Sequence, residues 1–445
     1  MSSIFGTDGI RGSFGTPPID PDTITRVGWA LGHTLRTRSD RVLVALGGDT
    51  RDSTPEVASW VERGLVAAGA EVANAGVVPT PAVAALVREL GAAGGVSISA
   101  SHNPWHDNGV KLFDALGFKW SQEEERRLES RLREAPRLAT SAERTSAPDP
   151  TLGERYLDCL LRALPAPRAL AGLHVVIDAA NGAASPWARR LFEAAGARVE
   201  SFHDQPDGEN INVACGSTVT EEIARLVRET GCDLGVAFDG DADRCMVADD
   251  TGRILDGDAI LFLLARDRMA RGLLDPARVV VTEMSNLGLD AALHRVGIDV
   301  VRCGVGDREV VEEMRRSGAI LGGEQSGHLL DLELGSTGDG LQSALQVALL
   351  VARAGAPLSR LAAPFETFPQ TLKNVRVRRK EPLEQIPGLN ELVADIRGRL
   401  GDEGRVLLRY SGTEPLARVM IEGRDKGTIE SMAGEMARLI ERHLG

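Results

Sequence analysis

The strongest constraint on the fold is a regular alternation of short apolar runs with amphipathic helical stretches. Three copies of one unit begin with an apolar run, pass through a polar loop and enter a helical stretch, at 42–53, 174–185 and 279–288. Each copy is followed by a second apolar run that ends in a strongly polar loop, at 94–104, 234–244 and 318–328. This alternation predicts α/β domains in which crossover helices join the strands of parallel sheets.

The position of the three polar loops predicts where a site would form. In open α/β sheets, ligands bind beyond the carboxyl ends of the strands. Each of the three loops follows the carboxyl end of a predicted strand. We therefore expect the three units to converge on one cleft.

The last part of the chain follows a different pattern. Strands are predicted at 374–380, 406–412 and 417–423, around helices near 384–400 and 427–443. This order predicts a small α+β domain at the C-terminus. Linkers are predicted in the Pro/Ser/Ala-rich stretch 135–150 and near 364–369, where a hinge is expected.

Charge and cysteine content narrow the class of protein. The chain has 64 acidic and 51 basic side chains and a formal net charge of -13, which argues against a general nucleic-acid or anionic-membrane binder. The start lacks a signal-peptide pattern, and no apolar run is long enough to span a bilayer. The five cysteines form no CxxC pair and have no zinc-site spacing, which predicts reduced thiols in a cytoplasmic protein. They are Cys159, Cys215, Cys232, Cys245 and Cys303.

The loop DGDADR carries three carboxylates, Asp239, Asp241 and Asp243, directly after an apolar run. Three such charges would repel one another without a divalent cation, and ligands that are all oxygen favour Mg²⁺, Ca²⁺ or Mn²⁺ over zinc. An EF-hand is excluded because Arg244 stands where its glycine belongs and Asp250 where its glutamate belongs. The alternative to a metal site is an acidic surface turn.

The loop SASHNP places Ser101 after an apolar run and before His102. A serine here is either a nucleophile or a phosphate carrier, and the alternative is an ordinary Asn-Pro turn. The G-x-S-x-G elbow of serine hydrolases is absent, and an immediate histidine neighbour does not support such an enzyme.

Three further segments offer polar groups for a ligand. In GGEQSGH, Glu324 and Ser326 suit sugar hydroxyls, and in FGTDGIRG, Arg11 suits a phosphate, although each segment is weak by itself. RYSGTEPLAR places arginines beside a turn whose backbone N–H groups can bind phosphate. A solvated turn is the alternative for this last segment.

Together and in this order, SASHNP, DGDADR, GGEQSGH and RYSGTEPLAR resemble the α-D-phosphohexomutase superfamily, as do FGTDGIRG, SHNPWHDNGVKLF and FPQTLKNVRV. The resemblance extends over essentially the whole chain. It implies an α/β protein of four domains around a central cleft, three related domains with mixed sheets and a smaller α+β C-terminal domain. The implied bounds are 1–145, 150–252, 253–365 and 370–445.

The resemblance also implies roles for individual residues. It implies a phosphoserine at Ser101, whose phosphate holds Mg²⁺ together with Asp239, Asp241 and Asp243. The residues near the transferred phosphate are Ser101, His102, Lys111, Arg11 and Arg244. The residues that bind the sugar and the distal phosphate are Glu324, Ser326, Arg409, Ser411, Gly412, Thr413 and Arg418. Lys111 is the expected proton shuttle, with a pKa lowered by neighbouring cations, and His102 is either an acid or a hydrogen-bonding partner.

The implied reaction converts glucosamine 6-phosphate to glucosamine 1-phosphate, for UDP-N-acetylglucosamine synthesis, through a glucosamine (or glucose) 1,6-bisphosphate. The alternatives are a mutase for glucose or mannose phosphates, a Mg²⁺ phosphatase, and a phosphosugar-binding protein without activity. The expected partner is a phosphosugar, with neither nucleic acid nor membrane, and the sequence is compatible with a homodimer. Three residues depart from the family pattern, namely Gly48, Ala242 and Glu309. Ala242 would leave the metal ligands undisturbed if its φ is negative.

Overall fold

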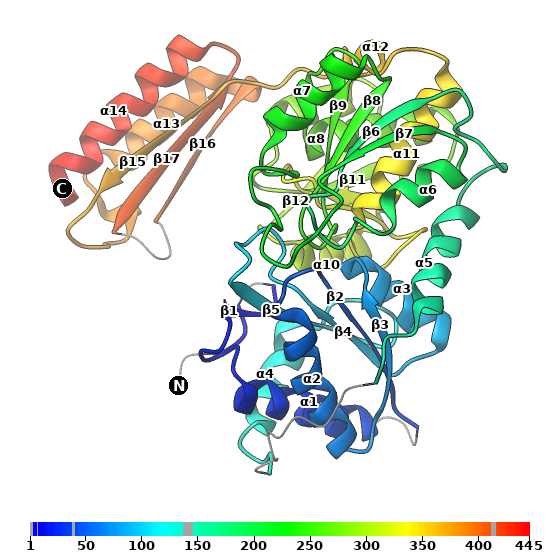
Figure 1. Ribbon diagram of the computed structural model, residues 1–445. Coiled ribbons are helices and arrows are strands. Elements are labelled where there is room, and N and C mark those ends of the chain that lie inside the picture. The colour runs from blue at the N-terminus through cyan, green and yellow to red at the C-terminus, as the bar shows by residue number, and fades with distance from the viewer. Residues whose placement is uncertain (1–2, 7, 38–40, 137–145, 411–414) are drawn as a thin grey trace. The chain divides into compact units, whose positions relative to one another are not determined.

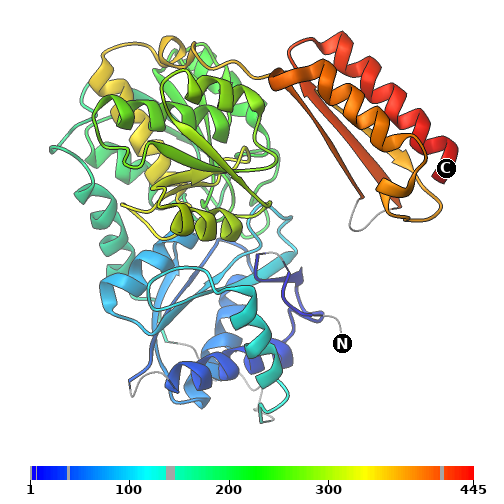
Figure 2. The same ribbon diagram turned by 180° about the vertical axis from the view of Figure 1, so that it is seen from behind.

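The computed structural model describes residues 3–6, 8–37, 41–136, 146–410 and 415–445. The chain divides into two compact units. The first combines Met1–Met284 with Gly297–Ala363, and the second combines Ser285–Val296 with Pro364–Gly445. The first unit holds three sheets and the second holds one (Figure 1; seen from behind in Figure 2).

The first sheet has the strand order β1-β5-β4-β2-β3. Its strands are β1 (Ile10–Ser13), β2 (Leu43–Gly48), β3 (Glu71–Val77), β4 (Gly94–Ile98) and β5 (Asp107–Phe113). The helices of this part are α1 (Pro21–Arg36), α2 (Thr54–Ala67), α3 (Thr80–Leu90) and α4 (Gln122–Arg131). Strand β2 is parallel to β3 and β4, whereas β5 is antiparallel to β4 and to β1.

The second sheet repeats this plan with the order β10-β9-β8-β6-β7. Its strands are β6 (His174–Asp178), β7 (Arg198–Phe202), β8 (Leu234–Phe238), β9 (Cys245–Asp249) and β10 (Ile254–Leu255). The helices are α5 (Pro150–Arg162), α6 (Ala188–Ala194) and α7 (Thr220–Thr230). Strand β6 is parallel to β7 and β8, and β9 returns antiparallel to β8.

The third sheet has the order β12-β11-β13-β14. Its strands are β11 (Arg278–Thr282), β12 (Asp299–Cys303), β13 (Leu321–Gly323) and β14 (Leu329–Asp331). The helices are α8 (Gly257–Ala270), α10 (Asp307–Ser317), α11 (Gly340–Ala354) and α12 (Leu358–Ala362). Strand β11 is parallel to β12 and β13, and β14 returns antiparallel to β13.

The prediction of α/β domains is confirmed, but the sheets are mixed and not purely parallel. In each sheet of the first unit, the strand after the polar loop runs antiparallel to the strand before it. The reason is the length of the loop. Only five residues separate Gly323 from Leu329, and a parallel crossover needs a dozen or more. The three polar loops are therefore hairpin connections at one end of their strands.

The second unit is an antiparallel sheet in the order β15-β17-β16 with two long helices. Its elements are α9 (Leu287–His294), β15 (Gln370–Arg376), η1 (Leu383–Gln385), α13 (Leu389–Leu400), η2 (Gly401–Glu403), β16 (Gly404–Tyr410), β17 (Leu416–Gly423) and α14 (Lys426–Leu444). The predicted α+β domain is confirmed, although β15 begins four residues before the predicted strand. Helix α14 packs on the sheet through apolar side chains at helical spacing, among them Ile429, Met432 and Met436.

Among the described residues, no helix is both long and apolar enough to cross a membrane. Each of the five cysteines is a free thiol within the described part of the chain.

Candidate active site

Two of the predicted loops meet at Ser101. The side chain of Ser101 is buried, and its Oγ donates a hydrogen bond to Asp239 Oδ2 at 2.6 Å. Ser101 follows β4 of the first sheet, and Asp239 follows β8 of the second. The carboxyl ends of these strands therefore bring together a hydroxyl and a carboxylate that lie 138 residues apart in the chain.

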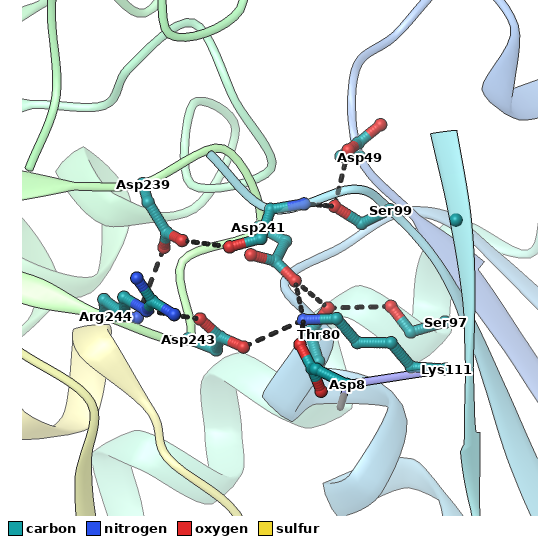
Figure 3. Close-up of polar contacts among 12 residues, drawn as sticks. Asp8, Asp49, Thr80, Ser97, Ser99, Lys111, Asp239, Asp241, Asp243 and Arg244 are labelled. Atoms are coloured by element: carbon teal, nitrogen blue, oxygen red, sulfur yellow. Dashed lines mark hydrogen bonds and ion pairs between the residues drawn. The ribbon is translucent and has the colours of Figure 1, made fainter. Parts of the chain in front are cut away.

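The backbone of Ser101 is held on both sides. Its φ is +53°, in the left-handed region that non-glycine residues rarely adopt. The N–H of Ser101 donates to Ser99 Oγ at 2.8 Å, and Ser99 Oγ donates to Asp49 Oδ2 at 2.6 Å (Figure 3). The carbonyl of Ser101 accepts from Arg51 Nη2 at 2.9 Å and from Asn212 Nδ2 at 3.0 Å. These contacts fix the strained conformation of the loop.

Arg51 and Asp49 form a buried pair behind this loop. Arg51 Nε donates to Asp49 Oδ2 at 2.9 Å, and both side chains have no exposed surface. The guanidinium also donates to the carbonyls of Asn103, at 2.9 Å, and of Pro104. Sequence reasoning missed these positioning residues. The signal was present in GGDTR, which places an acidic and a basic residue directly after an apolar run.

The three aspartates of DGDADR are buried and form a cluster. One carboxylate oxygen of each lies within 4.8 Å of the others. Burial, followed by repulsion from Asp243 and Asp241, raises the pKa of Asp239 to about 8. Asp241 Oδ1 and Asp243 Oδ1 are buried and accept no hydrogen bond from a described residue. An all-oxygen cluster with unmet negative charge fits a hard divalent cation such as Mg²⁺.

Ala242 departs from the expectation for the metal loop. Its φ is +54°, in the left-handed region, and not negative. The turn therefore has the geometry that favours glycine, and an alanine there costs about 1 kcal/mol. The three carboxylates still point toward one another, so the strain does not prevent the cluster from forming.

Lys111 lies among these carboxylates. Its Nζ donates to Asp241 Oδ2 at 2.7 Å and to Asp243 Oδ2 at 3.0 Å, and it lies 3.2 Å from Asp8 Oδ2 (Figure 3). Burial lowers the pKa of Lys111, but the three carboxylates outweigh it and hold the pKa well above its usual value. The expectation of a lowered pKa is therefore wrong for this arrangement. The charges nearest to Lys111 are carboxylates and not the predicted cations.

His102 and Arg244 lie beside the same cluster. His102 Nδ1 is 3.3 Å from Ser101 Oγ. Burial, together with Arg244 and Arg11, lowers the pKa of His102, so the imidazole is neutral at pH 7. The backbone N–H of Arg244 donates to Asp239 Oδ1 at 3.3 Å. The buried Nε atoms of Arg244 and Arg11 donate to no described residue, so both have a donor left for an anion.

The third predicted loop meets the metal loop across a cavity of about 620 Å³. Arg244, Glu324 and Ser326 line this cavity, together with Asp256 and Gln325. Glu324 Oε1 accepts from the N–H of Gly306 at 3.1 Å, and Ser326 Oγ donates to Glu324 Oε2 at 3.3 Å. The expected convergence of three loops on one site is therefore confirmed within the first unit.

Buried ionisable residues that sequence reasoning missed complete this region. Lys119 Nζ lies 2.6 Å from Asp8 Oδ1 and 2.6 Å from Asp307 Oδ2. His328 Nε2 lies 3.5 Å from Asp307 Oδ2, and His328 Nδ1 lies 3.8 Å from Asp243 Oδ1. A chain of ionisable side chains thus links all three sheets of the first unit. No short motif reveals this chain, because its members come from five separate segments.

In the second unit, Arg409 and Arg418 are directly paired between β16 and β17. Paired residues of neighbouring strands place their side chains on one face of the sheet, so the two arginines share a face. The other predicted members of this loop, Ser411, Gly412 and Thr413, lie outside the described residues.

Replacing Arg51 tests how the Ser101 loop is positioned. We expect Arg51→Met to lower kcat by roughly 10- to 100-fold, because three carbonyls of the loop lose a donor and the nucleophile moves out of line. Asn212→Ala should lower kcat less, since the Ser101 carbonyl keeps Arg51. Arg162→Met, which removes an exposed guanidinium, is the control. Steady-state kinetics measure the effect, and a change in KM with kcat unaltered would contradict it.

Two aspartate variants test the charge balance of the cluster without metal. The pKa of Asp239 is raised in the folded state, so its charge opposes folding at pH 7, and Asp239→Asn should raise the free energy of unfolding by on the order of 1–3 kcal/mol. The pKa of Asp243 is lowered despite burial, chiefly by Lys111. Asp243→Asn should therefore cost roughly 3–5 kcal/mol.

Urea unfolding in a chelator, and then in excess Mg²⁺, measures both effects. Mg²⁺ should stabilise the wild-type protein and fail to stabilise either variant to the same extent. Equal destabilisation by the two substitutions in the chelator would contradict this account of the cluster.

Comparison with known proteins identifies the family. Profiles of phosphoglucomutase/phosphomannomutase match residues 2–138 (alpha/beta/alpha domain I), 154–252 (domain II), 256–368 (domain III) and 372–439 (C-terminal domain). The phosphoglucosamine mutase of Koribacter versatilis is 44% identical over 454 residues, covering 100% of this chain and 98% of the relative. That of Geotalea daltonii is 42% identical over 450 residues, covering 100% and 99%.

Solved structures have the same architecture. A phosphoglucomutase/phosphomannomutase family protein from Burkholderia thailandensis superposes with a TM-score of 0.81 at 25% identity, covering 99% of this chain and 97% of that one. The Aspergillus fumigatus N-acetylphosphoglucosamine mutase in complex with GlcNAc-6P and magnesium has a TM-score of 0.63 at 19% identity, covering 98% and 95%, which supports the fold alone. The resemblance inferred from the four loops is thus confirmed, and the chain belongs to the phosphoglucomutase/phosphomannomutase family.

Proposed function

We propose that this enzyme is a phosphoglucosamine mutase, which interconverts glucosamine 6-phosphate and glucosamine 1-phosphate through a phosphoserine at Ser101. The observation that carries the proposal is the contact of Ser101 Oγ with Asp239, in a buried cluster of three carboxylates. The full-length relatives named phosphoglucosamine mutase support the choice of substrate. The product would supply UDP-N-acetylglucosamine synthesis.

The chemistry is a transfer between two oxygens. The P–O bond to Ser101 Oγ breaks, and a new P–O bond forms to the free hydroxyl of the sugar, which gives a 1,6-bisphosphate. The other phosphate then returns to Ser101. In the proposed site, Asp239, Asp241 and Asp243 would hold Mg²⁺, and the bound ion would neutralise charge on the phosphoryl oxygens. Arg11 and Arg244, whose Nε atoms donate to no described residue, would donate to the same oxygens.

The protonation states suggest how the proton moves. The sugar hydroxyl must lose a proton when it attacks, and Ser101 Oγ must gain one when it leaves. In the return step these roles reverse. Neutral His102, 3.3 Å from Ser101 Oγ, then accepts the proton that Ser101 loses, and the Lys111 ammonium donates one to the sugar oxygen that leaves. This division keeps Lys111 as the expected proton shuttle and gives His102 the role of its acid–base partner.

The remaining residues are proposed to bind the substrate. Glu324 and Ser326 bind sugar hydroxyls in the cavity of about 620 Å³. Arg409 and Arg418, with Ser411, Gly412 and Thr413 between them in the chain, would bind the phosphate that is not reacting, and the segment near 364–369 is the proposed hinge. The bisphosphate is both the intermediate and the activator that reloads Ser101.

Three broader expectations also stand as proposals. The domain bounds are 1–145, 150–252, 253–365 and 370–445, supported by the four sheets. The enzyme is cytoplasmic, supported by five free thiols. Its partner is a small phosphosugar, and a homodimer is a prediction that sedimentation of the full chain can test.

Loss of Ser101 tests the mechanism. We expect intact mass to show one phosphate on a fraction of the purified protein and none on Ser101→Ala, and mutase turnover to fall by at least about 10³-fold because the phosphoryl carrier is gone. Ser130→Ala, which removes an exposed serine hydroxyl on α4, is the control and should stay phosphorylated. Full turnover by Ser101→Ala in the presence of the bisphosphate would refute the mechanism.

A side-by-side comparison of substrates tests the specificity. We expect kcat/KM to be highest for glucosamine 6-phosphate among the 6-phosphates of glucosamine, glucose and mannose. Each tenfold preference corresponds to about 1.4 kcal/mol of transition-state binding. A higher value for glucose or mannose would replace the proposal with another hexose phosphate mutase. Release of inorganic phosphate without isomerisation would replace it with a phosphatase.

A further inference from the structure

A second cluster of ligand-type side chains lies at the carboxyl edge of the second sheet. Asp178 is the last residue of β6, His203 directly follows β7, and Cys215 lies in the loop before α7. A carboxylate oxygen, a ring nitrogen and the thiol sulfur of these three residues all lie within 4.8 Å of one another. None of the three is among the residues proposed to act on the phosphosugar.

The cluster has the burial and the geometry of a preformed site. Asp178 and Cys215 have no exposed surface, whereas 30% of the His203 side chain is exposed, which leaves a path from solvent. His203 Nδ1 lies 3.2 Å from Asp178 Oδ1, about the separation of two ligands on one tetrahedral zinc ion. Nδ1 is buried without a hydrogen-bond partner of good geometry among the described residues, although the interaction with Asp178 raises the pKa of His203.

Asp178 is held in place by the backbone of the same loops. Its Oδ1 accepts from the N–H of Ala180 at 2.9 Å, and its Oδ2 accepts from the N–H of Gly216 at 2.8 Å. Each carboxylate oxygen has two lone pairs, so one on each remains for an ion. A ligand fixed in this way needs little reorganisation to bind.

The charges of the cluster also fit a divalent ion. A carboxylate and a thiolate together carry two negative charges, and a neutral imidazole adds none, so a divalent cation makes the buried site neutral. Without an ion, burial, Asp178 and Glu222 raise the pKa of Cys215 to about 12. The thiol is then protonated, and an ion that binds it would release this proton.

We propose that Asp178, His203 and Cys215 form a binding site for a zinc-class divalent transition-metal ion, separate from the three aspartates at Ser101. One sulfur, one nitrogen and one oxygen ligand suit zinc, whereas Mg²⁺ prefers oxygen ligands alone. A fourth ligand would be water or Glu222. The Glu222 carboxylate adds to the effect of Asp178 in raising the pKa of His203, and to the effects of burial and Asp178 in raising the pKa of Cys215.

A Cys-His-Asp nucleophile is the other chemistry that this trio suggests, and the structure argues against it. The sulfur of Cys215 has no exposed surface, so no substrate can reach it. A reactive cysteine also needs a lowered thiol pKa, whereas that of Cys215 is raised.

An ion at this site would act on the loop that supports Ser101. Asn212 lies three residues before Cys215, its N–H donates to the carbonyl of Ala180 at 2.9 Å, and its side chain donates to the carbonyl of Ser101. The ion would therefore tie together the two loops that position Asn212. Its role is to stiffen this support and not to enter the reaction.

The test is metal binding by the full-length protein in excess Mg²⁺, which occupies the aspartate cluster. We expect one equivalent of Zn²⁺ to bind, as measured by competition with a chromophoric chelator, and Co²⁺ to produce the charge-transfer absorption of a cobalt–thiolate bond. His203→Gly and Cys215→Ala should weaken Zn²⁺ binding at least tenfold. Glycine is chosen for His203 because it accepts the φ of +47° there.

Two controls separate this site from other thiols and from the Mg²⁺ site. Cys232→Ala removes another buried thiol of the second sheet, and Asp239→Asn removes a ligand of the aspartate cluster. Both should bind Zn²⁺ like the wild type. The cobalt spectrum of the wild-type protein decides the matter even if a variant fails to fold. Absence of the thiolate band, or equal Zn²⁺ affinity in the wild type, His203→Gly and Cys215→Ala, would overturn the proposal.

Discussion

Repulsion among three buried carboxylates is the interaction on which the active site depends. Asp239, Asp241 and Asp243 are buried, so their charges are costly without a counter-ion, and burial, followed by repulsion, raises the pKa of Asp239. Lys111 offsets part of this cost through Asp241 and Asp243. Two of their oxygens, Asp241 Oδ1 and Asp243 Oδ1, accept no hydrogen bond from the described residues and could bind a divalent cation. The protein thus places uncompensated negative charge next to Ser101.

Behind the Ser101 loop, in contrast, the polar groups are paired and hold the backbone of Ser101 in place. A serine in the left-handed region keeps its position only if its surroundings determine it, and here both its N–H and its carbonyl are bound by side chains. The Asp49–Arg51 pair is buried and complete, with carbonyls taking up the remaining donors. The charges of the Asp49–Arg51 pair therefore cancel and the pair is rigid. The charges of the three aspartates in front of it do not cancel, so this cluster can bind a ligand. Rigid support with an unsatisfied face is how a site is preorganised.

The sequence was sufficient for the parts of this design that depend on topology. Polar loops after apolar runs predicted that Ser101, Asp239 and Glu324 would converge, because the carboxyl ends of strands in α/β sheets lie at one edge. The sequence was insufficient where a property, such as a pKa, depends on which charged groups lie nearest in space. The pKa of Lys111 rises because Asp8, Asp241 and Asp243 surround it, and these come from two separate segments. The φ of Ala242 and the antiparallel strand that follows each polar loop likewise depend on loop length and packing, which residue types do not encode locally.

The same topological rule has a consequence beyond catalysis. Cysteine spacing predicted no zinc site, because motif reasoning looks for ligands close together in sequence. Asp178 and Cys215 are 37 residues apart, yet β6 and the loop before α7 bring them to one edge with His203 between them in the chain. The carboxyl edge of a sheet brings together all the polar residues of its loops, and not only those that take part in the reaction. The second sheet therefore has the means to carry two chemically distinct sites, with Asn212 linking the one to the other.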